Sequence, residues 1–234
     1  LGFDGRVVNA SEAEKLSKEL EKKGASVCYE MDLVDLIWKN RPSLSKEPIL
    51  ILDQKYTGKA REDKIAEIRE KMKQEKVDLF LLTSLDEIAW LLNIRGNDVK
   101  CNPVVLSYLA LSQDQVLLFV NQEVVSNEVK KELEQSNVSI QEYSAFYSYI
   151  KKIPNQTKVF LDKTKVNFAV VKHLSNEVKV VNKTNLTLLP KAIKNPIEME
   201  HIRKAHQKDG VAMVKFIYWL KTQVKKEVIT EKSA

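Results

Sequence analysis

Apolar positions along the chain alternate between a strand-like and a helix-like period, which predicts an α/β fold. The helical period is clearest over residues 61–75, where Ile65, Ile68 and Met72 form one stripe. The strand-like runs are shorter, and the one at residues 79–82 is apolar at every position. A strand of that kind indicates a buried sheet.

The same pattern predicts a series of elements along the chain. We expect strands at residues 6–8, 25–29, 48–53, 78–83, 104–112, 116–120, 138–143, 158–162 and 178–181. We expect helices from Ser11 to Gly24 and at residues 32–39, 61–75, 85–92, 126–134, 145–152, 166–174 and 196–224. Residues 104–112 and 116–120 should form a hairpin that turns at Gln113 and Asp114, and residues 56–59 should form a separate turn.

Helix N-termini are marked by capping residues. Ser11 with Glu14, and Ser84 with Glu87, have the spacing of a capping box. Asn195, Pro196 and Glu198 supply a cap, an N1 proline and an N3 acid for the long helix that follows. Because capping and the helix dipole account for Asp86, Glu87 and Glu198, we expect no chemistry from these carboxylates. Thr230 predicts the cap of a further helix.

Composition narrows the class of protein. The chain has 234 residues, of which 44% are hydrophobic and 30% are charged, which excludes a disordered chain. No apolar run approaches the roughly 18 residues of a membrane-spanning helix, and no secretory signal pattern opens the sequence. Cys28 and Cys101 lack disulfide or metal spacing and are expected to be buried free thiols in a reducing cytoplasm. The six glycines build no nucleotide-binding loop.

The net charge of +6 is concentrated near one end of the chain. Residues 191–234 contain ten Lys or Arg and five Asp or Glu. A basic segment is typical of a nucleic-acid binder. It also fits half of a domain whose acidic half is absent, and we favour this second interpretation because the charges surround a helix with an apolar side. No nucleic-acid or membrane partner is therefore expected.

Two features suggest a piece of a longer protein. A weak repeat at an offset of 153 residues relates Val7-Val8-Asn9 to Phe160-Leu161-Asp162, although chance gives an equally good account. If the repeat is a duplication, residues 1–54 close a domain whose complete copy covers residues 59–190. The sequence also begins without Met and stops shortly after Thr230.

The residues that could carry chemistry form no familiar pattern. His201 and His206 lie about 140° apart around a helix and cannot share a metal ion, and His173 is isolated. We interpret all three as surface or packing residues. The polar loop at residues 93–103 has no structural explanation, and loops of this length are often functional. An ordinary solvated connection is an equal alternative.

Several sequence runs, taken in order, resemble one enzyme family. They are LGFD at 1–4, LVDLIWKNRP at 33–42, YTGK at 56–59, TSLDEIAWLLNIRGND at 83–98, NPVVLSY at 102–108, KAIKNP at 191–196 and RKAH at 203–206. They resemble the cytosolic X-prolyl aminopeptidases (aminopeptidase P) of the three-domain type. This resemblance spans nearly the whole chain, and the run at 83–98 is the most specific.

The resemblance implies a fold and an activity. Two creatinase/prolidase N-terminal-type domains, each a mixed β-sheet flanked by helices, would precede a "pita-bread" catalytic domain. Residues 1–54 would end the first domain, residues 59–190 would form the second, and residues 191–234 would hold the linker and opening helix of the third. Family members are cytoplasmic hydrolases, homodimers by expectation, that remove the first residue of a peptide whose second residue is proline.

The catalytic residues that the resemblance implies do not map onto this chain. The family holds two divalent ions, usually manganese, with ligands of the catalytic domain, and we expect these ligands beyond Ala234. This part of the enzyme would instead shape substrate access and assembly. The candidate substrate-facing residues are Arg95, Asn93, Asp98 and Asn102, with Arg95 as an anchor for a substrate carboxylate or carbonyl. The alternative is an interaction module of a relative whose pita-bread domain has lost catalysis.

Overall fold

The computed structural model describes residues 1–224 and 226–233. The chain divides into two compact units. The larger unit contains Leu1–Asp53 and Lys59–Ile193, and the smaller contains Gln54–Gly58 and Lys194–Ala234.

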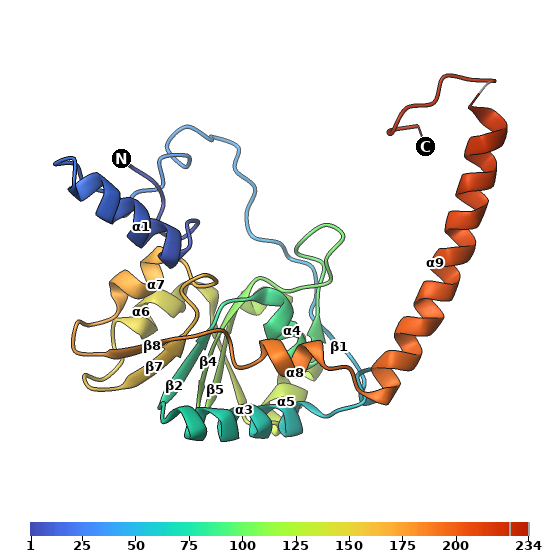
Figure 1. Cartoon of the computed structure of the whole chain (residues 1–234). Helices are drawn as coiled ribbons and strands as arrows, with labels where there is room; N and C mark the ends of the chain where they lie inside the picture. The colour runs from blue at the N-terminus through green and yellow to red at the C-terminus, as the bar shows by residue number, and fades with distance from the viewer. Residues whose placement is uncertain (225, 234) are drawn as a thin grey trace. The chain divides into compact units, whose positions relative to one another are not determined.

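The larger unit is built on a six-stranded mixed sheet in the order β6-β5-β4-β2-β7-β8 (Figure 1). Its strands are β2 (Leu79–Leu82), β4 (Ser107–Ser112), β5 (Val116–Val120), β6 (Val138–Glu142), β7 (Lys158–Leu161) and β8 (Lys179–Asn182). Antiparallel pairs join β2 to β4 and β4 to β5, and the other three pairs are parallel. The predicted mixed sheet and the hairpin between β4 and β5 are confirmed.

Helices cover both faces of this sheet (Figure 1). Phe80 and Leu82 pack on one face with α3 (Arg61–Glu75), α4 (Leu85–Leu92) and α5 (Asn127–Gln135). Leu79 and Leu81 pack on the other with α6 (Phe146–Ile150) and α7 (Phe168–His173). Because side chains alternate between faces and both faces are covered, every position of β2 is buried. This explains the unbroken apolar run in the sequence.

Short elements complete the larger unit. A two-stranded antiparallel ribbon joins β1 (Leu50–Ile51) to β3 (Ile94–Arg95). The remaining elements are α1 (Ala10–Glu21), α8 (Leu188–Ala192) and the 3-10 turns η1 (Gln122–Val124) and η2 (Tyr143–Ala145). Helix α1 packs beside α7, and Ala10 belongs to the same core as α7.

The smaller unit consists of α2 (Gln54–Thr57) and the long helix α9 (Pro196–Gln223). The predicted capping box is confirmed, since the Asn195 side chain accepts from the Glu198 amide and the Glu198 carboxylate accepts from the Asn195 amide, both at 3.0 Å. Asn195 also donates to the carbonyl of Thr57 at 2.8 Å. The predicted turn at residues 56–59 is wrong in part, because Tyr56 and Thr57 lie in α2 and only Gly58 has a positive φ of 67°.

The N-terminal segment departs most from the prediction. Residues 6–8 form a turn and not a strand, because Asp4 accepts from the amide and the guanidinium of Arg6. Asn9, and not Ser11, caps α1 by accepting from the Glu12 amide. The expected strand at 25–29 is reduced to one bridge between Cys28 and Gly2. The proposed repeat relates residues 7–9 to residues 160–162. A helix follows in both copies, α1 in the first and α7 in the second, but residues 6–8 form a turn whereas Phe160 lies in β7.

Two further elements are shorter than expected. Residues 32–39 form turns, because the Asp32 carboxylate accepts from the Val34 and Asp35 amides and binds Arg41 at 2.5 Å, which closes the chain locally. The strand expected at 48–53 is only β1, and Leu50 is 61% exposed. Near the end of the chain, Thr230 accepts from the Ser233 amide in a turn. The expected helix there extends to Ala234, which lies outside the described residues.

Both cysteines are exposed, so the prediction of buried thiols is wrong. Cys28 lies on the N-terminal segment, away from the two cores. Cys101 occupies the tip of a tight turn with a φ of 62°. Apolar neighbours in the sequence were a poor guide, because these segments are not part of the packed sheet.

Candidate functional site

The loop at residues 93–103 begins at a buried asparagine. Asn93 ends α4 in the left-handed conformation, with a φ of 54°, and is only 3% exposed. Its side-chain oxygen Oδ1 accepts from Lys64 Nζ at 2.7 Å, and its Nδ2 donates to the Lys59 carbonyl at 3.0 Å. Asn93 therefore fixes the base of the loop from within the protein.

Lys64 was not predicted from the sequence, although it is 1% exposed. Its ammonium also donates to the Trp90 carbonyl at 2.9 Å and lies 4.6 Å from the centre of the Trp90 ring. Buried cations are rare without such partners. The available signal was its position, four residues before Ile68 on the apolar stripe of α3.

Arg95 lies in β3 and contacts the end of α4. Its Nη1 donates to the carbonyls of Ala89 and Ile94, both at 2.8 Å. A cation at this position satisfies a C-terminal carbonyl and complements the helix dipole. Arg95 thus belongs to the framework of the loop, and its side chain is partly exposed.

Gly96 and Asp98 shape the middle of the loop. A Cβ at Gly96 would lie 2.7 Å from Val105 Cγ2 and 3.1 Å from the Val104 carbonyl oxygen, so a larger residue would push the two strands of the loop apart. The Asp98 Oδ2 accepts from the Leu106 amide at 2.7 Å. Its Oδ1 is buried and has no donor among the described residues. Asp98 therefore fixes the segment that leads into β4, and its Oδ1 can still accept a hydrogen bond.

The loop tip is a tight turn. The Asn102 amide donates to the Val99 carbonyl at 3.0 Å, and Val99 and Asn102 form an isolated antiparallel bridge. Asn102 is exposed, as are Asn97 and Lys100. The structure therefore separates the four candidate residues: Asn93 is buried at the base, Arg95 and Asp98 line the middle, and Asn102 lies at the tip.

A second buried polar cluster was missed because Glu87 was assigned to helix capping. Glu87 is 2% exposed, and its carboxylate accepts from the Thr187 hydroxyl and from Asn185 Nδ2, the latter at 3.2 Å. Ser84 is the N-cap of α4, but its side chain makes no capping bond and instead accepts from Asn185. The cluster fastens the segment before α8 to α4.

Asp86 stands beside this cluster at the surface. Partial burial opposes its ionisation, but the hydrogen bond and charge of Lys191 together with the backbone amides of Asp86 and Glu87 outweigh that effect and lower the pKa of the carboxyl. The pair Lys191–Asp86 adds a second attachment of α8 to α4.

Neither of these sites resembles a metal centre. Within residues 1–224 and 226–233, no three side chains of His, Cys, Asp or Glu converge as metal ligands would. A pair of divalent ions therefore does not fit the residues that the structure describes. The described helices also include none with the length and apolarity needed to cross a membrane.

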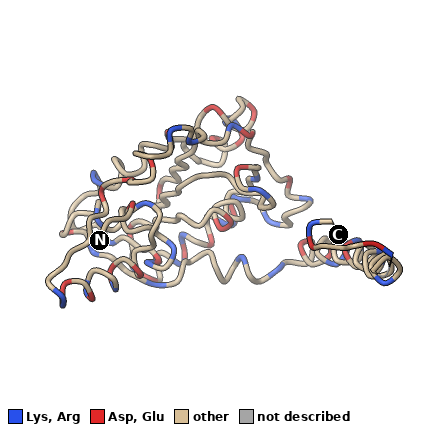
Figure 2. The backbone as a smooth tube through the Cα atoms, turned by 90° about the horizontal axis from the view of Figure 1, so that it is seen from above, with Lys and Arg blue, Asp and Glu red and all other residues tan. Residues whose placement is uncertain are grey.

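Figure 2 shows Lys and Arg interleaved with Asp and Glu along the chain, including within α9. In α9, Lys204 pairs with Glu200 at 2.6 Å.

Comparison with known proteins places this geometry in a family. Residues 40–198 match the Creatinase/Prolidase N-terminal domain. Over 96% of its length the chain is 34% identical to a probable Xaa-Pro aminopeptidase P from Sclerotinia sclerotiorum and 34% identical to Xaa-Pro aminopeptidase 1 from Dictyostelium discoideum. These matches cover 39% and 37% of those two relatives.

A solved structure shows the same arrangement. The X-prolyl aminopeptidase of Caenorhabditis elegans, described as a cytosolic enzyme with a di-nuclear active site, superposes with a TM-score of 0.87 at 33% identity. The match covers 95% of this chain and 37% of that protein. The chain thus spans less than two-fifths of the length of the relatives it matches.

Proposed function

The chain belongs to the Creatinase/Prolidase N-terminal domain family, and from this premise we propose that it forms the non-catalytic N-terminal portion of a metal-dependent X-Pro aminopeptidase. The whole enzyme would hydrolyse the bond before a penultimate proline and release the first residue of a peptide. This portion would shape substrate access and assembly.

One observation carries the proposal. The likeness to the C. elegans enzyme extends over 95% of the chain with a TM-score of 0.87, so it includes α9 as well as the sheet. Helix α9 is also poorly covered in the described structure, since Val211, Val214 and Tyr218 are 57%, 68% and 71% exposed. Apolar residues this exposed indicate a surface that packs against further protein.

The proposed domain division follows the resemblance. Residues 1–54 would be the end of a first creatinase-like domain, residues 59–190 a complete second one, and residues 191–234 the linker and opening helix of the catalytic domain. The two divalent ions, manganese by preference, would be held by that catalytic domain. We also propose a cytoplasmic homodimer for the whole enzyme.

The loop at residues 93–103 supplies the proposed substrate-facing surface. Arg95, Asp98 and Asn102 are at least partly exposed and are held by backbone hydrogen bonds, which favours a preformed surface. Arg95 would contact a substrate carboxylate or carbonyl. Asn93 would support these residues from beneath, because it is buried.

The first test uses the chain alone. Purified protein is incubated with Mn²⁺ and the tripeptide Arg-Pro-Pro, then dialysed and assayed for metal. We expect no release of arginine and no retained stoichiometric manganese. Release of arginine, or a retained equivalent of metal, would contradict the assignment of a non-catalytic portion.

A further inference from the structure

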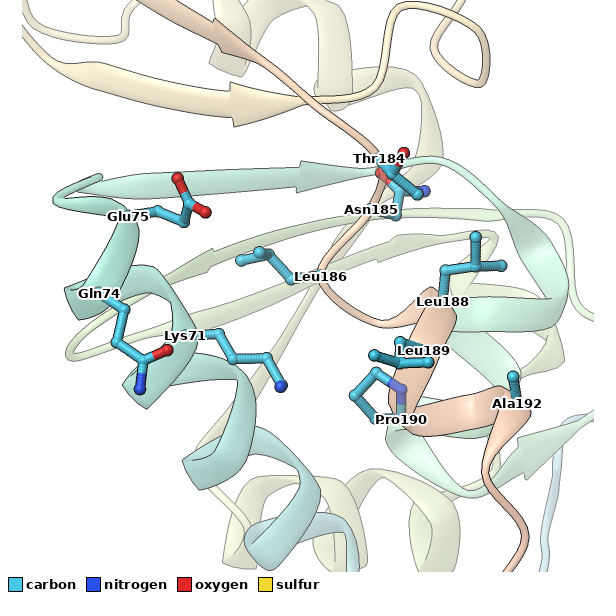
Figure 3. A pocket seen from close by; sticks show the side chains of 10 residues that line it. All are labelled: Lys71, Gln74, Glu75, Thr184, Asn185, Leu186, Leu188, Leu189, Pro190 and Ala192. Atoms are coloured by element: carbon cyan, nitrogen blue, oxygen red, sulfur yellow. The ribbon is translucent and has the colours of Figure 1, made fainter.

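A cleft of about 470 Å³ lies within the larger unit, between α3 on one side and α8 with the segment that leads into it on the other (Figure 3). Lys71 and Gln74 come from α3, and Leu186, Leu189 and Pro190 come from the opposite side. Figure 3 shows the side chains of these residues on the two sides of the gap. Nothing in the aminopeptidase assignment uses this cleft.

The two walls differ in chemistry. Leu186, Leu189 and Pro190 make one wall apolar, and Leu189 is 64% exposed. The α3 wall is cationic, because its acid Glu75 pairs at 2.5 Å with Lys183, which lies outside the lining. The Glu67 carboxylate lies 2.7 Å from Lys59 Nζ but 3.8 Å from Lys71 Nζ, so it pairs mainly with Lys59. The ammonium of Lys71 can therefore form an ion pair with another anion.

An unsatisfied acceptor lies at the base of the cleft. Asn185 lines the cleft and is 5% exposed, and its Nδ2 is held by Ser84 and Glu87. Its Oδ1 is buried, and nothing among the described residues donates to it. Leaving a buried acceptor without a donor destabilises the protein, which favours a ligand that brings an N–H group.

We infer that this cleft binds the carboxyl-terminal end of a short peptide whose last residue is apolar. The terminal carboxylate pairs with Lys71, the apolar side chain packs on Leu189 and Pro190, and the peptide N–H is directed toward Asn185. These three groups occur together at the end of a peptide, and the volume suits one or two residues.

The test uses N-acetyl-Ala-Leu with a free carboxylate and the same compound as its carboxyl-terminal amide. Binding to the full chain is followed by the shifts of backbone amide signals in two-dimensional NMR. We expect millimolar binding of the acid, with shifts confined to the lining residues, and about tenfold weaker binding of the amide. Equal binding of acid and amide, shifts elsewhere, or no binding would overturn the inference.

Two variants locate the contacts. Lys71→Gln should weaken binding of the acid about tenfold and leave the amide unchanged, and Leu189→Ser should weaken both ligands. Both side chains are partly or largely exposed, so neither variant removes core packing. Lys73→Gln is the matched control, because Lys73 is on the same helix, is exposed and pairs with Glu70. An unchanged affinity in Lys71→Gln, or an equal loss in the control, would contradict the proposed contact.

Discussion

Lys64 and Asn93 are joined by a buried hydrogen bond of 2.7 Å between the lysine ammonium and the asparagine side-chain oxygen. This bond connects the first turn of α3 to the residue at which α4 ends. The ammonium also binds the carbonyl of Trp90 in the last turn of α4. The pair therefore sets where the loop at residues 93–103 leaves the protein.

Replacing Lys64 tests this role. In Lys64→Met the buried oxygen atoms of Asn93 and Trp90 lose their donor, and we expect the free energy of unfolding to fall by about 2–4 kcal/mol. Urea denaturation followed by circular dichroism gives the value. Lys73→Met, at an exposed site of the same helix, should change it by about 0.5 kcal/mol or less. A loss below about 1 kcal/mol in Lys64→Met would show that Lys64 does not organise the loop.

Gly96 and Gly210 should respond in opposite directions to alanine. At Gly96 the added methyl meets Val105 and the Val104 carbonyl, so Gly96→Ala should destabilise the protein by about 1–3 kcal/mol. At Gly210, inside α9, the methyl meets open space, so Gly210→Ala should increase helicity and stabilise α9 by about 1 kcal/mol. Thermal unfolding and ellipticity at the helix band measure both. A neutral Gly96→Ala would contradict the close approach.

Glu87 should control the attachment of the segment before α8. In Glu87→Ala the Thr187 hydroxyl and Asn185 amide lose their acceptor, and about 3 kcal/mol of stability should be lost. Hydrogen exchange by mass spectrometry should show faster exchange of residues 184–192 in this variant. Glu70→Ala, at an exposed carboxylate of α3 that pairs with Lys73, provides the control, and unchanged protection in Glu87→Ala would refute the attachment.

Buried tyrosines predict a loss of stability in alkali. Burial, followed by neighbouring tyrosine hydroxyls, raises the pKa of Tyr108, and burial raises the pKa of Tyr147 and Tyr149. A raised pKa in the folded protein contributes stability below the unfolded pKa of about 10, and this contribution is lost as the pH rises above it. The urea midpoint should therefore fall between about pH 9 and pH 11.

A single variant isolates this effect. Tyr149→Phe should have a smaller alkaline fall in the urea midpoint than the parent protein, because one group whose pKa is higher in the folded than in the unfolded protein has been removed. Tyr218→Phe, at a tyrosine that is 71% exposed, is the matched control and should leave the pH dependence unchanged. Identical pH profiles for Tyr149→Phe and the parent would contradict the prediction.

The sequence predicted those elements whose local signals agreed with their packing. The run at β2, the stripe of α3 and the cap formed by Asn195 and Glu198 were confirmed because periodicity and capping act over a few residues. The helix expected at residues 32–39 was wrong, since Ile37 is 79% exposed and has no core to cover, while Asp32 makes turn hydrogen bonds instead. Where a segment has no tertiary packing partners, local hydrogen bonds determine its conformation.

The site was harder to predict for a related reason. The segment at residues 93–103 was predicted as an irregular loop, whereas Ile94–Arg95 form β3 in the structure. The supports of Asn93 and Glu87 come from residues 29 and 100 positions away along the chain. No periodic pattern reports such pairs. A charged residue on an apolar helical stripe, as at Lys64, is the one local sign that was present.

The central claim is tested most directly by a chimera. The part of the C. elegans X-prolyl aminopeptidase that this chain matches, 37% of that protein, is replaced by the present 234 residues, and kcat/KM is measured with Arg-Pro-Pro. We expect the chimera to release arginine, and Arg95→Ala within it to lower kcat/KM about tenfold or more while Lys73→Ala does not. A folded, metal-loaded chimera without X-Pro activity, or one indifferent to Arg95→Ala, would contradict the account.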